Sequence, residues 1–215
     1  MVNFTILELG LDCRNPFSGV YLAFENSTQK RQPLTTQQIR QLQDACYQVD
    51  HDMRWLVALI SDTGMRLAEA AGLKTEDLKL NHEHPHITLK PYPHRSLKTK
   101  ASERVIPLVG ASLWAAERVV ASTQSDFCFA RYTNSESCNS NSASAAINKW
   151  VKTVVGNEAV VHGLRHSFRD RLRQAEAPIE VIDQLGVWSL RTVGQSYGNG
   201  YSLEVLHKCM KSISL

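Results

Sequence analysis

The spacing of apolar residues constrains the fold of this chain most. Through most of its length these residues recur every three or four positions, as Ile39, Leu42 and Cys46 do, which is the repeat of an α-helix with one buried face. Only two short stretches, 87–90 and 104–109, have the composition typical of strands. The chain is therefore expected to be an α+β protein, mostly helical, with a small antiparallel sheet.

Breaks in this pattern mark the expected element boundaries. Thr35 or Thr36 can cap the first helix, because a threonine hydroxyl accepts a hydrogen bond from a free N–H of the first turn. Gly64 is expected to end the second helix and to permit a sharp turn. A polar stretch, 132–141, is expected to be a loop without packing contacts. Helices are expected over about 36–49, 52–62, 66–72, 111–122, 142–155, 162–175, 178–185 and 202–213.

Basic residues gather in two stretches, although the formal net charge is only +3. Residues 90–104 hold three lysines and two arginines against one acid, and residues 162–174 hold four arginines against one acid. Local patches of this kind attract a polyanion even when the whole chain is nearly neutral. A solvated helix or hairpin face has the same composition. The side chains expected to contact such a polyanion are Arg95, Lys100, Arg104 and Arg169.

Composition excludes several other classes of protein. Five cysteines without a CxxC pair argue against a disulfide framework or a zinc site, and they favour the reduced thiols of a cytoplasmic protein. The N-terminus lacks the pattern of a signal peptide, and no apolar run approaches the roughly 18 residues of a membrane span. The HEHPH stretch (82–86) has three alternating histidines but no fourth partner nearby, so we expect no metal site.

Two motifs in the first half of the chain carry cations suited to a phosphate. DTGMRLAEA (62–70) places Arg66 and Glu69 three residues apart, and therefore on one side of a helix. SLKTKASERVIPL (96–108) joins the two expected strands, so Lys98 is expected on a cationic hairpin tip. Lysine at such a tip is also what protects any exposed sheet edge.

Two motifs in the second half add donors and a nucleophile. HGLRHSF begins with His162 and places Arg165 on the same side of a helix start, where its guanidinium can bind two phosphate oxygens as a fork. LGVWSLRTVGQSYGNGY (185–201) places Trp188 nine residues before Tyr197. An indole N–H donates without titrating, and a phenol is a weak nucleophile that neighbouring cations can activate.

These motifs, in this order, resemble the catalytic domain of the tyrosine recombinases, the phage integrase family. The resemblance runs from about Thr35 to the C-terminus and implies an enzyme that breaks DNA through a 3′-phosphotyrosyl intermediate and a free 5′-hydroxyl. Because the phosphotyrosyl ester retains the bond energy, neither ATP nor a metal cofactor is expected. The implied catalytic residues are Arg66, Lys98, His162, Arg165, Trp188 and Tyr197, with Glu69 in support.

Three of these assignments have a rival or depart from the common pattern. Lys98 is the expected general acid, because a lysine with a pKa near 10.4 stays protonated at neutral pH, and Lys100 is its rival. Tyr197 is the expected nucleophile, and Tyr201 is its rival. Many members have a histidine one position earlier than Trp188, so the tryptophan takes that role by its spacing from the tyrosine.

The resemblance also predicts domains and partners. Residues 1–34 are expected to be a lead-in or linker, residues 35–215 the catalytic domain, and the helical DNA-clamping domain common in the family is expected to be absent. The partner is expected to be a double-stranded recombination site. A last apolar stripe either docks on a neighbouring protomer of a DNA-bound tetramer or packs on its own domain; it comprises Leu203, Leu206, Met210 and Ile213.

The leading function is therefore site-specific DNA recombination, as in the integrase of a mobile element. Two alternatives remain from the sequence. A type IB topoisomerase-like enzyme would share the chemistry, and a DNA-binding remnant of an integrase would have lost it.

Overall fold

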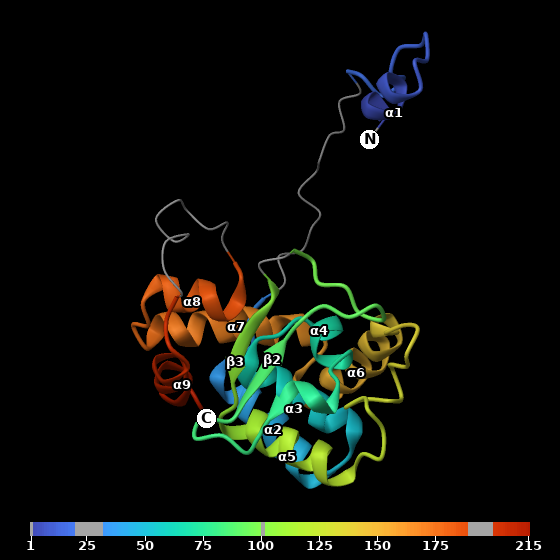
Figure 1. The fold of residues 1–215 in the computed structure, drawn as a ribbon. Helices are drawn as coiled ribbons and strands as arrows, with labels where there is room; N and C mark the ends of the chain where they lie inside the picture. The colour runs from blue at the N-terminus through green and yellow to red at the C-terminus, as the bar shows by residue number, and fades with distance from the viewer. Residues whose placement is uncertain (1, 20–31, 100–101, 189–199) are drawn as a thin grey trace. The chain divides into compact units, whose positions relative to one another are not determined.

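The computed structural model describes residues 2–19, 32–99, 102–188 and 200–215, and the chain divides into two units, Met1–Lys30 and Arg31–Leu215 (Figure 1). The first unit contains the short helix α1 (Val2–Glu8), and none of its described residues is buried. Helix α1 was not predicted from the sequence, because its apolar residues do not form a buried face. The second unit contains all the other helices and strands.

The first two helices of the second unit begin and end as their capping residues predict. The Thr35 hydroxyl accepts from the Gln38 N–H at 3.2 Å, and the Gln38 side chain accepts from the Thr35 N–H at 2.9 Å, so helix α2 (Thr36–Gln48) begins with a capping box. Helix α3 (Asp52–Thr63) ends at Gly64, which has a φ of +60°. Both the conformation and the space there require glycine, since a Cβ would lie 2.3 Å from Phe168.

The remaining helices agree with the predicted ones to within two residues at most ends. They are α4 (Leu67–Ala71), α5 (Gly110–Ser122), α6 (Ser140–Val155), α7 (Val161–Gln174), α8 (Ile179–Gly186) and α9 (Leu203–Lys211). The 3₁₀ turn η1 (Thr75–Asp77) was not predicted. No helix of the described residues is long and apolar enough to cross a lipid bilayer.

The sheet has three antiparallel strands in the order β1–β2–β3: β1 (Leu78–Lys79), β2 (His86–Leu89) and β3 (Arg104–Pro107). Ile87 pairs with Ile106, and Leu89 pairs with Arg104. Strands β2 and β3 confirm the predicted hairpin. Strand β1 is only two residues long, which is too short to show alternation in the sequence.

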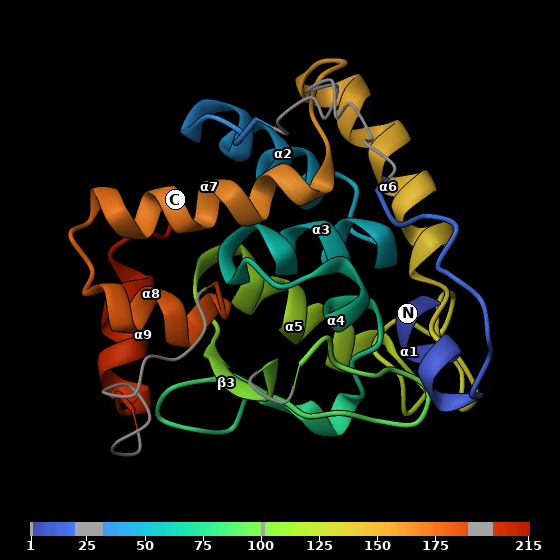
Figure 2. The same cartoon turned by 90° about the horizontal axis from the view of Figure 1, so that it is seen from above.

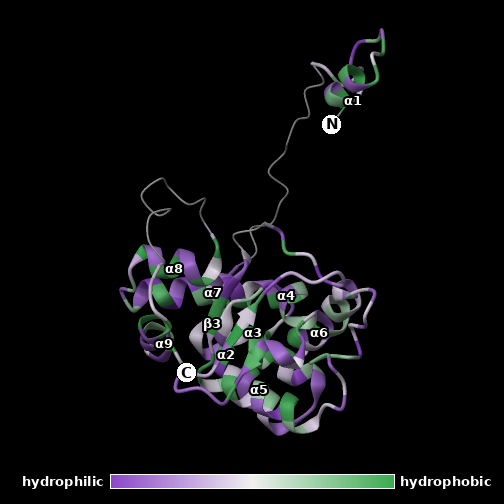
Figure 3. Cartoon of the chain, viewed as in Figure 1, coloured by the Kyte–Doolittle hydropathy of each residue, from purple (hydrophilic) through white to green (hydrophobic). Residues whose placement is uncertain are grey.

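Helix α3 lies at the centre of the second unit and packs against α2, α5 and α7, while α8 and α9 lie against β3 (Figures 1 and 2). Hydrophobic residues colour much of α3 and β3 in the interior (Figure 3). The largest fully buried side chains include Phe129 and Phe168. The fold is therefore mostly helical with a small antiparallel sheet, as predicted.

The polar stretch 132–141 differs from its prediction at one end. Tyr132 and Thr133 are buried, and the Thr133 hydroxyl donates to the Ala71 carbonyl at 2.9 Å. The prediction of a loop without packing contacts is wrong for these two residues. Composition misled it, because one threonine in a polar run can bond a backbone carbonyl that no local pattern reveals.

The apolar stripe of α9 packs on its own domain. Leu206, Met210 and Ile213 are buried, and α9 contacts β3. The Ile213 carbonyl accepts from Arg171 at 3.0 Å, which ties the residues after α9 to α7. This is the second of the two arrangements considered from the sequence, in which the stripe packs on its own domain.

Candidate active site

Arg66 and Glu69 meet at the start of α4 as the motif predicts. The Arg66 guanidinium donates to Glu69 Oε1 at 2.6 Å, and the Arg66 backbone N–H donates to Glu69 Oε2 at 3.0 Å. The Glu69 side chain is 4% exposed and that of Arg66 is 26% exposed. The carboxylate therefore fixes both the helix start and the arginine, while the guanidinium keeps a face toward solvent.

Arg165 joins the turn before Arg66 to the end of α8. Its guanidinium donates to the Gly64 carbonyl at 2.6 Å and also to the Gly186 carbonyl. The residue is buried, and both of these acceptors are neutral. The charge of Arg165 is thus held in place by two backbone dipoles and is not cancelled by a bonded carboxylate.

Trp188 lies against the same arginine. The Arg165 guanidinium carbon is 4.7 Å from the centre of the indole ring, and that of Arg169 is 5.4 Å from it. A Cβ on Gly186 would lie 1.8 Å from the indole, so glycine at this position gives the ring its place. The structure thus brings Trp188 and half-buried Arg169 to the Arg165 side chain.

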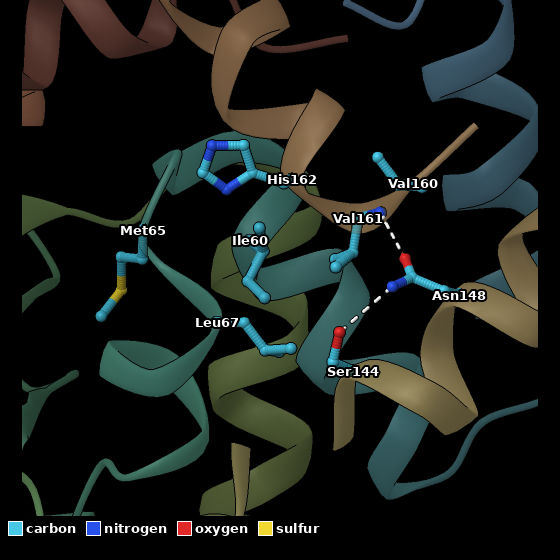
Figure 4. Close-up of a pocket in the computed structure, with 8 residues that line it drawn as sticks. All are labelled: Ile60, Met65, Leu67, Ser144, Asn148, Val160, Val161 and His162. Carbon is cyan, nitrogen blue, oxygen red and sulfur yellow. Dashed lines mark hydrogen bonds between the residues drawn. The ribbon is translucent and has the colours of Figure 1, made fainter. Parts of the chain in front are cut away.

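His162 occupies the first turn of α7, one turn before Arg165. It lines a pocket together with Met65 and Leu67, the two residues on either side of Arg66 (Figure 4). On the other side of this pocket Asn148 accepts from the Val161 N–H at 2.8 Å, which fixes the start of α7. The predicted histidine therefore lies beside the predicted first arginine.

The charges in this region are mostly positive. Burial first, and then the nearby guanidinium groups of Arg66, Arg104 and Arg169, lower the pKa of Arg165 to about 10. Glu69 opposes this effect. Burial alone would raise the pKa of Glu69, but the charge and hydrogen bond of Arg104, followed by the bonds from Arg66, lower it. The region therefore combines four guanidinium groups with one ionised carboxylate.

Lys98 is exposed on the segment that joins β2 to β3. The hydroxyl of the next residue, Thr99, is hydrogen-bonded to the Ser102 hydroxyl at 3.1 Å. The Ser102 hydroxyl also accepts from the Arg66 guanidinium at 3.4 Å. Ser102 is fully buried. This serine, which the sequence analysis did not single out, links the lysine segment to the first arginine.

Of the two tyrosines considered as the nucleophile, only Tyr201 belongs to the described residues. Tyr197 lies outside the described residues, as does Lys100. Tyr201 is 37% exposed, and its backbone exchanges two hydrogen bonds with the Gln184 side chain, at 2.9 and 3.1 Å. Gln184 belongs to α8, so this helix bonds to the backbone on the far side of the segment that contains Tyr197.

Two arginines predicted to contact DNA are instead buried. Arg95 donates to the Glu69 carbonyl at 2.8 Å and to the Lys90 carbonyl. Arg104 donates to the Glu69 carboxylate at 3.0 Å, and its side chain is 4% exposed. Protein oxygens thus engage all three nitrogens of the Arg104 guanidinium and two of the three of Arg95.

The alternating histidines of the HEHPH stretch contact other histidine rings. The rings of His82 and His86 meet edge to face at 4.8 Å, and His84 stacks on His207 at 4.8 Å. Among the described residues, no group of three or more His, Cys, Asp and Glu side chains is arranged to hold a metal ion.

Comparison with known proteins decides the family. The family model described as "Phage integrase family" matches residues 32–202, well over half of the chain. The chain belongs to the phage integrase family. Its match includes the whole run of motifs from Arg66 to Tyr197, as the resemblance in the sequence predicts. Among curated protein sequences, none matches this integrase-family chain.

Solved structures agree on the fold. The Tn1549 transposon integrase in complex with transposon right end DNA is 17% identical with a TM-score of 0.57, over 91% of this chain and 73% of that one. XerA recombinase is 16% identical with a TM-score of 0.56, over 97% and 67%. XerH recombinase bound to difH before cleavage is 20% identical with a TM-score of 0.57, over 88% and 58%. At such identities the likeness establishes the fold of this family member.

Proposed function

We propose that residues 35–215 form the catalytic domain of a site-specific DNA recombinase, which breaks and rejoins strands through Tyr197. The substrate is a double-stranded recombination site, as in the complexes of the Tn1549 integrase and XerH. One observation supports this most: the guanidinium groups of Arg66, Arg104 and Arg169 lie near that of Arg165, and a single carboxylate, Glu69, opposes them there. So much uncompensated positive charge, partly removed from water, favours an anion at this place.

The anion is a scissile phosphate. Arg66 and Arg165 bind its non-bridging oxygens, and they stabilise the negative charge that grows on these oxygens in the transition state. Because Arg165 is already held by two carbonyls, little reorganisation is needed when the phosphate arrives. The indole N–H of Trp188 supplies a further donor that does not titrate.

The reaction exchanges one phosphodiester for another. The Tyr197 oxygen forms a bond to phosphorus, the bond from phosphorus to the 5′-oxygen breaks, and the phenolic proton passes toward His162. Lys98 gives a proton to the departing oxygen, so that a 5′-hydroxyl is released. Rejoining runs the same steps in reverse with a new 5′-hydroxyl, and it requires no other reactant.

The remaining proposals concern partners and location. We propose a tetramer on two DNA duplexes during recombination, with Lys100 and Arg169 on the DNA backbone. A DNA substrate and five unpaired cysteines agree with a location in the cytoplasm.

A nicked suicide substrate tests the function. The nick lets a short strand diffuse away after cleavage, so that the covalent adduct accumulates and shifts in a denaturing gel. The parent is expected to form the adduct, Tyr197→Phe to form none, and Tyr201→Phe to form it at the parental rate. A parent that binds the DNA without forming an adduct would instead indicate a DNA-binding remnant.

A further inference from the structure

Arg104 is buried at the point where three parts of the candidate active site meet. It belongs to β3, and its side chain is 4% exposed. Its guanidinium donates to three different acceptors: Nη2 to the Glu69 carboxylate at 3.0 Å, Nε to the Leu185 carbonyl at 2.7 Å, and Nη1 to the Ser102 carbonyl at 2.8 Å. All three nitrogens of the planar group are thus engaged.

Each acceptor of Arg104 is one step from a residue of the proposed site. Glu69 Oε2, which accepts from Arg104, also accepts from the Arg66 backbone, and Oε1 of the same carboxylate holds the Arg66 guanidinium. The Leu185 carbonyl is followed directly by the Gly186 carbonyl, which accepts from Arg165. Arg104 therefore contacts the carboxylate that holds Arg66 and the residue directly before the one that holds Arg165.

The third acceptor connects Arg104 to the lysine segment. Ser102 gives its carbonyl to Arg104, while its hydroxyl accepts from Arg66 and lies within 3.1 Å of the Thr99 hydroxyl. Lys98 precedes Thr99 directly. A single buried guanidinium thus joins the start of α4, the end of α8 and the connection between β2 and β3.

We infer that Arg104 is a positioning residue for strand cleavage, which fixes Glu69 and the end of α8 so that Arg66 and Arg165 face one phosphate. The inference rests on the proposed function, because it concerns the same site. Arg104 does not touch the DNA. It acts through the carboxylate and the two carbonyls that it binds.

A lysine cannot replace Arg104 in this role. Its ammonium is a single point, whereas the three acceptors lie around a planar group that offers donors in fixed directions. Removal of the guanidinium would also leave Glu69 buried without its strongest cationic partner. Burial would then raise the pKa of this carboxyl, and protonated Glu69 would lose its ionic hold on Arg66.

Arg171 provides a matched control. It also forms a buried ion pair, with Asp62 at 2.9 Å, and it also donates to backbone carbonyls, those of Ser61 and Ile213. Its bonds join α7 to α3 and to the C-terminal residues, and none of its three partners belongs to the proposed site. Arg171→Lys therefore measures what the loss of a buried arginine does to the fold alone.

The test is the single-turnover rate of adduct formation on the nicked substrate, at saturating protein. Arg104→Lys and Arg104→Met are expected to slow it by about 100-fold, the loss typical of a misplaced catalytic group, with DNA affinity unchanged. Arg171→Lys is expected to lower the melting temperature and to keep the parental rate. If Arg104→Met does not fold, Arg104→Lys, which keeps the charge, decides the question.

The pH profile separates positioning from a general loss of structure. Relative to the parent at each pH, Arg104→Met is expected to lose activity toward acid pH as Glu69 takes up a proton. The activity of the Arg104→Met/Glu69→Gln double variant is expected to stay a constant fraction of the parent's. Parental rates in both Arg104 variants, or equal slowing by Arg104→Lys and Arg171→Lys, would overturn the inference. Absence of adduct with the parent would instead count against the proposed function itself.

Discussion

At the scale of single residues, Gly64 shows how one position joins the fold to the site. It has a φ of +60°, its carbonyl holds Arg165, and a Cβ there would lie 2.3 Å from Phe168. Gly64→Ala is expected to lower the free energy of unfolding by about 2–5 kcal/mol, from left-handed strain and overpacking together. Denaturant unfolding measures this loss.

A double-variant cycle separates the two causes. In a Phe168→Ala background the ring is gone and only the Cβ, 3.0 Å from the added methyl, remains. The cost of Gly64→Ala is therefore expected to fall to about 1–2 kcal/mol, most of it backbone strain. An equal cost in both backgrounds would mean that the contact with Phe168 contributes nothing.

Glu69 predicts a pH dependence of stability. Its pKa in the folded chain is lower than the ordinary value of 4.5, so the unfolded chain binds the proton more readily. Its stabilising contribution is therefore complete above pH 4.5 and is lost as the pH falls through the lower folded value. Relative to Glu69→Gln, the parent is expected to be about 3–5 kcal/mol more stable at pH 7.

Denaturant unfolding of both proteins from pH 7 to pH 3 checks this prediction. The advantage of the parent is expected to shrink on the acid side of pH 4.5. An advantage that stays constant or grows toward acid pH would show that the carboxylate is not stabilised by its arginines.

Single residues were also where sequence and structure differed. The sequence indicates that Arg95 and Arg104 belong to a basic stretch, but it does not reveal that their acceptors lie far along the chain. The Leu185 carbonyl is 81 residues from Arg104, and the Glu69 carboxylate is 35 residues from it. Only tertiary packing distinguishes an arginine bonded to protein oxygens in the interior from one on the surface.

At the scale of elements, periodicity predicted most of the fold. The helices with one apolar face, such as α2 and α7, were found near their expected bounds because burial of that face decides both their pattern and their place. Strand β1 and helix α1 were missed, since neither is long enough or buried enough to produce a pattern. Four site residues in or next to three helices lie in one region: Arg66 directly before α4, His162 and Arg165 in α7, and Trp188 just after α8.

Helix α9 provides a test at this scale. Met210 is fully buried, whereas Val205 on the same helix is 38% exposed. Met210→Ala is expected to lower the free energy of unfolding by about 2–5 kcal/mol through the cavity it leaves. Val205→Ala is expected to change it by less than about 0.5 kcal/mol.

The protein concentration in this experiment decides where α9 docks. Packing within one chain predicts that the stability is independent of concentration. A stability that rises with concentration would instead show that the helix is buried against a second copy.

At the scale of the whole molecule, positive charge is gathered in one region of a nearly neutral chain. A chain with a net charge of only +3 brings three further guanidinium groups and one carboxylate near Arg165, and the family to which it belongs suggests why. In the proposed function these cations bind a DNA phosphate, and a tyrosine attacks it. Tyr197, the proposed nucleophile, lies outside the described residues, whereas its rival Tyr201 is described.

The mass of the DNA-linked peptide tests this claim most directly. Trypsin cleavage after Arg191 and Lys208 gives one peptide, 192–208, that contains both Tyr197 and Tyr201. Fragmentation of this peptide from the trapped adduct is expected to place the nucleotide on Tyr197. A nucleotide on Tyr201, or on a residue outside this peptide, would contradict the account.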